Sequence, residues 1–233
     1  MKLTKFAKKL VLPQRNELLS ERQVFYRKKF GRFLFTNFFI HFNQKKNLEY
    51  LSFQLFKDEY NIIKSYLPKK IYNIMDIGCG LGIINILLQK HYKNNIKYFL
   101  IDKDKVDLKI KYGFKENYES YNDLNETKKI INSNGIKNEN IFIFNADKRI
   151  MIDSKIDLVI SLKSMGYHYP YEKYLDLLKR VTSVNCVFIF DVASKKYEDL
   201  EIIKKHFREY EVIFSEDSIH PLKRVVFKGL IKD

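Results

Sequence analysis

The sequence predicts an α/β protein with a mostly parallel sheet, helices on both faces and an antiparallel pair of strands at the C-terminal end. Five short apolar segments separated by helical patterns indicate parallel strands that are buried on both faces. Two later strand segments are joined too closely for a helical crossover, so we expect them to pair antiparallel. A glycine-rich turn between the first of these strands and its helix is typical of α/β domains that bind nucleotide-like ligands.

The predicted elements alternate regularly after residue 48. A helix predicted over residues 48–67 has apolar side chains near one face, and Pro68 ends it. The predicted strands cover residues 71–75, 97–101, 140–144, 156–161, 186–190, 211–215 and 224–230. The predicted helices between them cover residues 81–91, 123–133, 170–181 and 197–207, and residues 103–122 form a longer connection. Together they predict a seven-stranded sheet in a domain of residues 49–233.

Residues 1–48 precede this domain and carry most of the excess positive charge. The chain has a formal net charge of +15, and this segment has twelve Lys or Arg against two Glu. Aromatic residues are interleaved with the cations between Arg22 and Phe42. We interpret the segment as a cap or lid whose aromatic side chains pack on the core. The alternatives are that its charge attracts nucleic acid, an anionic membrane surface or a phosphorylated acceptor.

The glycine-rich turn reads Asp76-Ile77-Gly78-Cys79-Gly80-Leu81-Gly82. Its spacing differs from the G-x-G-x-x-G pattern of dinucleotide-binding turns, and a carboxylate beside the first glycine would repel a pyrophosphate. A ligand with positive charge suits Asp76 better. Asp102 ends the next predicted strand, 20 residues after Gly82, where a carboxylate can accept hydrogen bonds from ribose hydroxyls. The turn and Asp102 therefore predict a site for a cationic nucleoside.

This turn resembles the first motif of class I S-adenosylmethionine-dependent methyltransferases. The resemblance implies an enzyme with the Rossmann-like fold of that family and S-adenosylmethionine as cofactor. It places the turn around the methionine end of the cofactor, Asp102 at the ribose and Asp147 near the adenine. The cofactor-binding residues expected on this basis are Asp76, Gly78, Gly80, Gly82, Asp102, Asp147 and Ser161. The alternative is a glycine turn with unrelated acidic residues nearby.

The loop that follows strand 156–161 carries the candidate catalytic residues. It reads Ser-Leu-Lys-Ser-Met-Gly-Tyr-His-Tyr-Pro over residues 161–170, and ligands of open α/β sheets bind at such carboxyl ends of strands. His168 is the candidate general base because an imidazole accepts a proton near neutral pH. Asp191, which follows the next strand, is a candidate for orienting it. Tyr167 and Tyr169 are candidate substrate-binding residues. The alternative for His168 is a structural role within the loop.

Residues 161–170, with Tyr174 and Leu175, also resemble the S-L-x-S-W-G-[FY]-H-Y-P-x-x-x-Y-L segment of a set of bacterial methyltransferases. These enzymes are often associated with modification of sugars or surface polysaccharides. The likeness covers roughly residues 70–195, and Met165 departs from it where the group has tryptophan. It implies O-methylation of a small, sugar-like or nucleotide-linked acceptor.

Two other functions stay open from the sequence. One is an RNA methyltransferase that acts on ribose or base, although Ser-Leu-Lys-Ser at 161–164 differs from the Asn/Asp-Pro-Pro-Tyr/Phe motif of base-nitrogen enzymes. The other is a non-catalytic, cofactor-binding accessory subunit. Cysteine and histidine spacing does not indicate a metal site.

The expected location is the cytoplasm. Cys79 and Cys186 are expected to be free thiols in a reducing compartment. The sequence has neither a secretory signal pattern nor an apolar run of membrane-spanning length. It does not indicate the oligomeric state.

Overall fold

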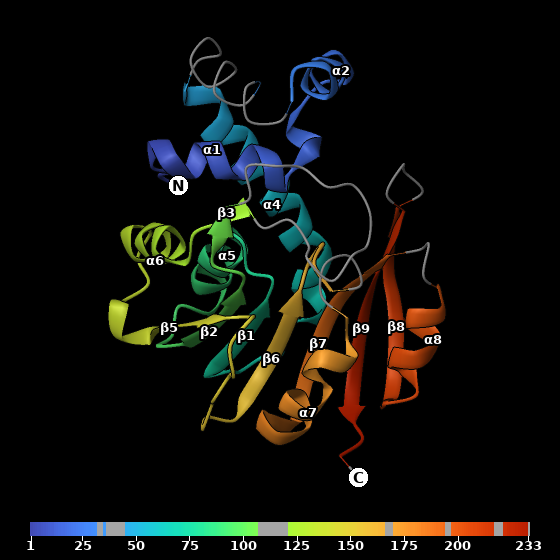
Figure 1. Cartoon of the computed structure of the whole chain (residues 1–233). Helices are drawn as coiled ribbons and strands as arrows, with labels where there is room; N and C mark the ends of the chain where they lie inside the picture. The colour runs from blue at the N-terminus through green and yellow to red at the C-terminus, as the bar shows by residue number, and fades with distance from the viewer. Residues whose placement is uncertain are drawn as a thin grey trace.

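A computed structural model of the chain describes residues 1–31, 35, 45–106, 121–165, 170–193, 197–216 and 221–232. Seven strands form one sheet in the order β5-β2-β1-β6-β7-β9-β8 (Figure 1). The strands are β1 (Asn73–Ile77), β2 (Lys97–Asp102), β5 (Ile141–Asn145), β6 (Ile156–Ser161), β7 (Thr182–Ala193), β8 (Phe207–Glu216) and β9 (Leu222–Leu230). The first five of these are parallel, and β9 runs antiparallel to both β7 and β8. The predicted fold class is confirmed.

The described helices are α1 (Lys5–Gln14), α2 (Glu21–Phe30), α4 (Lys45–Ile63), α5 (Ile83–Tyr92), α6 (Leu124–Ser133), α7 (Glu172–Val181) and α8 (Tyr197–Lys204). The helices from α4 onwards lie close to their predicted positions, whereas α1 and α2 lie in the segment for which the sequence predicts a cap without helix bounds. The helix predicted over 197–207 is shorter than expected, because Phe207 begins β8 and packs its ring 4.9 Å from that of Phe188. The stretch expected to be a connection contains a small two-stranded sheet, β3 (Lys105–Val106) and β4 (Tyr121–Asn122).

Alternate side chains of the strands enter two separate hydrophobic clusters. Ile74 and Leu158 pack with residues of α1, α4, α5 and α6. Their neighbours Met75 and Val159 pack with residues of α7 and α8. Because successive side chains of a strand point to opposite faces, the two clusters show that helices cover both faces of the sheet.

The N-terminal helices α1 and α2 lie above the carboxyl ends of the parallel strands (Figure 1). Leu10 and Val11 of α1 are buried in the same cluster as Ile83 of α5, so α1 packs on the layer of α4, α5 and α6. The Ser20 side chain accepts a hydrogen bond at the N-terminus of α2, in a capping box with Gln23. The division of the chain into a cap of residues 1–48 and a domain of residues 49–233 stays a prediction.

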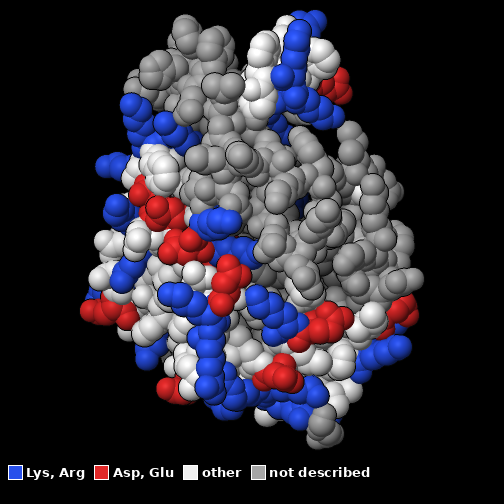
Figure 2. Space-filling model, in the orientation of Figure 1, with Lys and Arg blue, Asp and Glu red and all other residues white. Residues whose placement is uncertain are grey.

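Charged side chains of both signs are mixed on the face shown in Figure 2. Where side chains are described on this face, Lys and Arg lie at its top, along its left side and in its lower part, and Asp and Glu lie among them in each of these places. Among the described helices, none has both the length and the apolar character needed to cross a membrane.

Candidate functional site

The glycine-rich turn joins β1 to α5 and is shaped by close packing. Gly82 has a φ of +68°, and its backbone forms the N-cap of α5. A Cβ atom at Gly82 would lie 2.2 Å from Cδ1 of Ile131 on α6. Gly78 donates a 2.7 Å hydrogen bond from its N–H to the carbonyl of Ile101 at the end of β2. The turn is therefore fixed against both α6 and β2.

Asp102, the last residue of β2, binds the turn directly. Its Oδ2 atom accepts hydrogen bonds from the N–H of Gly80 at 2.7 Å and from Nδ2 of Asn122 at 3.1 Å. Its Oδ1 atom accepts from the N–H of Lys103 at 2.7 Å. The side chain is 9% exposed. These bonds hold the Asp102 carboxyl group beside the turn, at the edge of the sheet where the sequence predicts the ligand.

Asp76 is a second buried carboxyl group beside the same turn. It is 2% exposed, and Nδ2 of Asn85 on α5 donates a 2.6 Å hydrogen bond to its Oδ2. The pKa of Asp76 is raised to about 7, chiefly by burial and also by the negative charge of Asp102, and the Asn85 hydrogen bond opposes this rise. A cation bound here would favour the charged form and lower this pKa. With Asp76 and Asp102 beside it, the turn suits a ligand that carries positive charge and hydroxyl groups.

The raised pKa of Asp76 gives a stability prediction. The pKa is 3.8 in an ordinary setting and about 7 in the fold, so the folded chain binds the proton more tightly. The resulting stabilisation is complete below about pH 4 and is lost as the pH rises towards about 7. Relative to an Asp76→Asn variant, the wild type is expected to lose about 2 kcal/mol of unfolding free energy between about pH 5 and about pH 8. Urea denaturation measures this, and parallel pH profiles would contradict it.

Asn122 and Thr127 brace the turn from the side, and sequence reasoning missed both of them. The Gly80 carbonyl accepts hydrogen bonds from Nδ2 of Asn122 at 3.0 Å and from Oγ1 of Thr127 at 2.7 Å. Both residues lie at the start of α6 or just before it, and Asp123 between them is the N-cap of that helix. Asp123 predicts the start of this helix, because aspartate is a favoured N-cap residue. The sequence does not indicate which residues near it form hydrogen bonds with Gly80.

The other two expected cofactor-binding residues also lie at carboxyl ends of strands. Asp147 is exposed and follows β5; the N–H of the preceding residue, Ala146, donates a 2.8 Å hydrogen bond to the Asp102 carbonyl. Ser161 ends β6 and is fully buried. Its Oγ donates to the Ile77 carbonyl at 2.8 Å and accepts from the N–H of Met165 at 3.0 Å. The carboxyl ends of β5, β2, β1 and β6 therefore lie side by side. The two hydrogen bonds of Ser161 connect the end of β1 to Met165 in the loop after β6.

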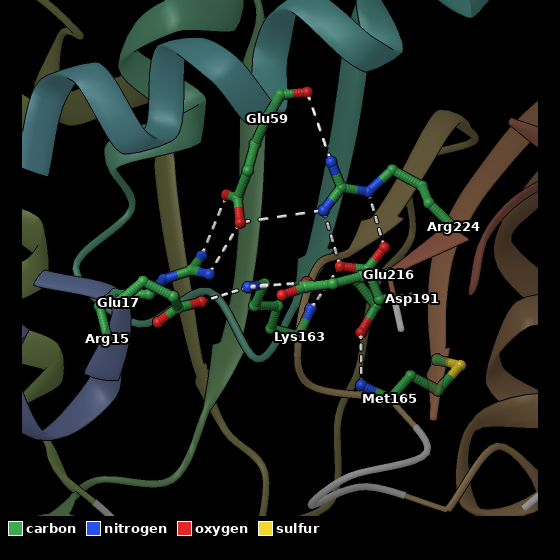
Figure 3. A network of polar contacts seen from close by, with 9 residues as sticks. Arg15, Glu17, Glu59, Lys163, Met165, Asp191, Glu216 and Arg224 are labelled. Carbon is green, nitrogen blue, oxygen red and sulfur yellow. Dashed lines mark hydrogen bonds and ion pairs between the residues drawn. The ribbon is translucent and has the colours of Figure 1, made fainter. Parts of the chain in front are cut away.

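A network of buried ion pairs lies next to this edge of the sheet (Figure 3). Arg224 of β9 bonds Asp191 of β7 through Nε and Nη2, at 2.7 and 2.8 Å. Nη2 of Arg224 also lies 3.8 Å from Oε1 of Glu59 on α4. Glu59 in turn accepts two hydrogen bonds from Arg15, at 2.8 and 3.1 Å. Each of these four residues is at most 7% exposed.

Lys163 connects the loop after β6 to this network. Its N–H donates a 3.0 Å hydrogen bond to Oδ2 of Asp191, and its Nζ pairs with Glu17 and lies 3.7 Å from Glu216. Burial opposes the charge on Glu17, but the positive charges of Arg15 and Lys163 still lower its pKa. Lys163 has a φ of +54°, which side-chain-bearing residues rarely adopt. The network therefore holds the first part of this loop in an unusual backbone conformation.

The candidate catalytic residues are only partly described. Asp191 is fully buried, and its oxygens accept from Arg224 and from the Lys163 N–H. His168, Tyr167 and Tyr169 lie outside the described residues. The roles expected for these four side chains stay predictions.

Comparisons with known proteins support the fold. No family model matches the sequence, and no curated protein matches it. The structure is similar to a candidate O-methyltransferase from Nostoc punctiforme PCC 73102, with a TM-score of 0.52 and 13% identity over 75% of this chain. This chain spans only 57% of that protein's length.

Two further solved structures share the architecture. One is precorrin-6y C5,15-methyltransferase from Geobacter metallireducens GS-15, with a TM-score of 0.50 and 13% identity over 71% of this chain and 84% of the other. The other is the StiE O-MT segment, with a TM-score of 0.50 and 13% identity over 79% of this chain and 76% of the other. At this level of identity the likeness shows that the chain has the fold of these methyltransferases.

Proposed function

We propose that this chain is an S-adenosylmethionine-dependent methyltransferase. The observation that carries the proposal is the pair of buried carboxyl groups, Asp76 and Asp102, on either side of the glycine-rich turn. Two carboxylates would repel a pyrophosphate, but they suit a ligand with an ammonium group, a sulfonium and ribose hydroxyls. The fold that this chain shares with methyltransferases supports the same conclusion.

Each residue of the site then has a binding role. Asp76 faces the positive end of the cofactor, and Asp102 accepts hydrogen bonds from its ribose. Gly78, Gly80 and Gly82 let the backbone approach the ligand. Asp147, after β5, and Ser161, at the end of β6, contact the cofactor from the neighbouring strands. When bound, S-adenosylmethionine supplies a methyl group on a positively charged sulfur.

For the acceptor, we propose a small, sugar-like or nucleotide-linked molecule that is methylated on oxygen. The loop after β6 holds it, with Tyr167 and Tyr169 as walls. His168 takes the proton from the acceptor hydroxyl as the oxygen–methyl bond forms and the sulfur–methyl bond breaks. Most of the rate enhancement comes from holding the reacting atoms in line in a site that excludes water.

Replacing Asp102 with alanine is expected to weaken S-adenosylmethionine binding by about 1.5–3 kcal/mol, because ribose hydroxyls lose a charged acceptor. The Gly80 N–H also loses its acceptor, so the folded fraction of the variant is checked by circular dichroism. Isothermal titration measures the affinity. Unchanged affinity in a folded variant would rule out the ribose role.

The proposed function is tested by titrating the protein with S-adenosylmethionine and, separately, with NAD. Micromolar binding of the first and none of the second is the expected result. Nucleotide sugars and RNA are then screened as acceptors of a labelled methyl group. Failure to bind S-adenosylmethionine would overturn the proposal.

A second acceptor class, RNA, is favoured by the surface of α2. Phe25 and Phe30 are 63% and 56% exposed, and Arg22, Lys28 and Lys29 are exposed beside them. Cations and aromatic rings are interleaved around the helix rather than separated onto two faces, which suits single-stranded nucleic acid better than a membrane surface.

The two acceptor classes differ in their response to salt. An RNA acceptor predicts tight binding of an unstructured RNA, with an affinity that falls steeply as salt is raised. Replacement of Phe25 and Phe30 by alanine would weaken this binding, since each base that stacks on an aromatic ring contributes about 1–3 kcal/mol. Weak RNA binding that is the same in wild type and variant would leave the small acceptor as the proposal.

A further inference from the structure

The small sheet of β3 and β4 brings Asn122 to the carboxyl end of β2. The chain leaves β2 at Asp102, forms β3 directly afterwards and later returns as β4, in which Asn122 pairs with Lys105. Just after β4, the N–H of Leu124 donates a 3.0 Å hydrogen bond to Oδ1 of Asp104. The returning strand is therefore fixed beside the residues that follow Asp102.

The side-chain amide of Asn122 has a partner for each of its polar atoms. Its Nδ2 atom donates to the Gly80 carbonyl at 3.0 Å and to Oδ2 of Asp102 at 3.1 Å. Its Oδ1 atom accepts a 3.3 Å hydrogen bond from Oγ1 of Thr127. Asn122 is 3% exposed. An amide turned the other way would point its oxygen at a carbonyl and a carboxylate, so these contacts fix its orientation.

Asn122 constrains the carboxylate of Asp102 in turn. Oδ2 of Asp102 accepts hydrogen bonds from the Gly80 N–H at 2.7 Å and from Asn122, and Oδ1 accepts from the Lys103 N–H at 2.7 Å. The two backbone donors place the carboxylate beside the turn. Because the last torsion of an aspartate side chain has a broad energy minimum, the plane of the carboxylate is set by such donors. Asn122 adds one from a third segment of the chain.

We propose that Asn122 is a positioning residue that orients the Asp102 carboxylate towards the ribose hydroxyls of the cofactor. It thereby sets the preference of the site for a ribose over a sugar that lacks these hydroxyls. This assignment rests on the proposed function, in which Asp102 accepts hydrogen bonds from the ribose. Hydrogen bonds weaken steeply as their angle departs from linear, so a carboxylate that rotates loses much of what each hydroxyl contributes. In this assignment Asn122 acts through Asp102 and does not contact the ligand.

The test compares two ligands that differ only at the ribose. They are S-adenosylhomocysteine and its analogue without the 2′ and 3′ hydroxyls, and isothermal titration measures both affinities. The wild type is expected to bind S-adenosylhomocysteine at least about tenfold more tightly than the analogue. In Asn122→Ala, this ratio is expected to fall below about threefold. The ratio cancels a loss that affects both ligands alike, such as a general loosening of the turn.

Two further variants control for effects on the fold. Asn125→Ala removes an exposed asparagine in the first turn of α6 and is expected to keep the wild-type ratio. Asn122→Ser keeps a small polar side chain that is one atom too short to replace the amide at Asp102, so its ratio is expected to fall as in Asn122→Ala. Circular dichroism checks that each variant is folded, and Asn122→Ser decides the test if Asn122→Ala does not fold.

The outcomes separate this assignment from the proposed function. If the wild type binds neither ligand, the proposed function fails and the assignment fails with it. Equal binding of both ligands by the wild type would overturn the ribose role of Asp102 and this assignment, but not the choice of cofactor. If the wild type prefers the ribose and the Asn122 variants keep that preference, Asn122 only braces the turn and the assignment is overturned. Loss of the preference in these variants, but not in Asn125→Ala, supports it.

Discussion

Replacing Arg224 with methionine is expected to lower the free energy of unfolding by about 3–5 kcal/mol. Arg224 is 1% exposed and forms two hydrogen bonds with Asp191, which is fully buried. Methionine fills much of the same space but leaves Asp191 as a buried charge without its partner. The Lys163 N–H, which donates to the same carboxylate, is a weaker counterpart than a guanidinium.

Urea denaturation of the Arg224→Met variant measures the effect. Lys228→Met is the matched control, since Lys228 is exposed on the same strand and its loss is expected to change stability by no more than about 0.5 kcal/mol. Equal stabilities of the two variants would show that the buried pair contributes nothing net to the fold.

Replacing Gly82 with alanine is expected to have the second large effect. The φ of +68° costs a side-chain-bearing residue about 1–2 kcal/mol. The new Cβ would also meet Ile131 at 2.2 Å, and such overpacking costs about 1–3 kcal/mol more. Because Gly82 forms the N-cap of α5, any shift of α6 away from it would also disturb the turn.

The control for this change is Gly135→Ala. Gly135 has a φ of +103°, and a Cβ there would meet nothing within 4 Å, so this variant carries backbone strain without a clash. Thermal unfolding is expected to show a clearly lower midpoint for Gly82→Ala than for Gly135→Ala. Similar midpoints would show that α6 shifts to accommodate the added methyl group with little loss of stability.

The positions of four of the parallel strands could be predicted from the sequence because their causes are local, whereas β7 and β8 both begin earlier than predicted. Apolar segments of strand length, broken by glycine or by charged residues, locate β1, β2, β5 and β6 within a few residues. Because the carboxyl ends of parallel strands lie at one edge of a sheet, Asp76 and Asp102 were expected to lie together. The structure places β1 beside β2 in parallel, as this expectation requires.

The ion-pair network could not be predicted, because it joins residues far apart in the sequence. Asp191 was interpreted as a partner for His168 because it was expected to follow a strand at the ligand edge. The strand β7 is longer than predicted, and Asp191 lies within it, paired with β9. The residue opposite it, Arg224, depends on the register between β7 and β9, which no local pattern encodes. The approach of Gln14, the last residue of α1, to Gly80 could not be predicted for the same reason, since nothing near it in the sequence indicates that α1 ends against the glycine-rich turn.

The position of β9 between β7 and β8 also constrains the order of events during synthesis. In the part of the sheet that the structure describes, β8 pairs only with β9, yet the ribosome makes β8 first. Until β9 emerges, the β8 segment of the nascent chain has no strand to pair with, and Asp191 has no Arg224 side chain to bond. Unpaired strand edges invite aggregation, so a chain stalled before residue 222 is a natural client for chaperones.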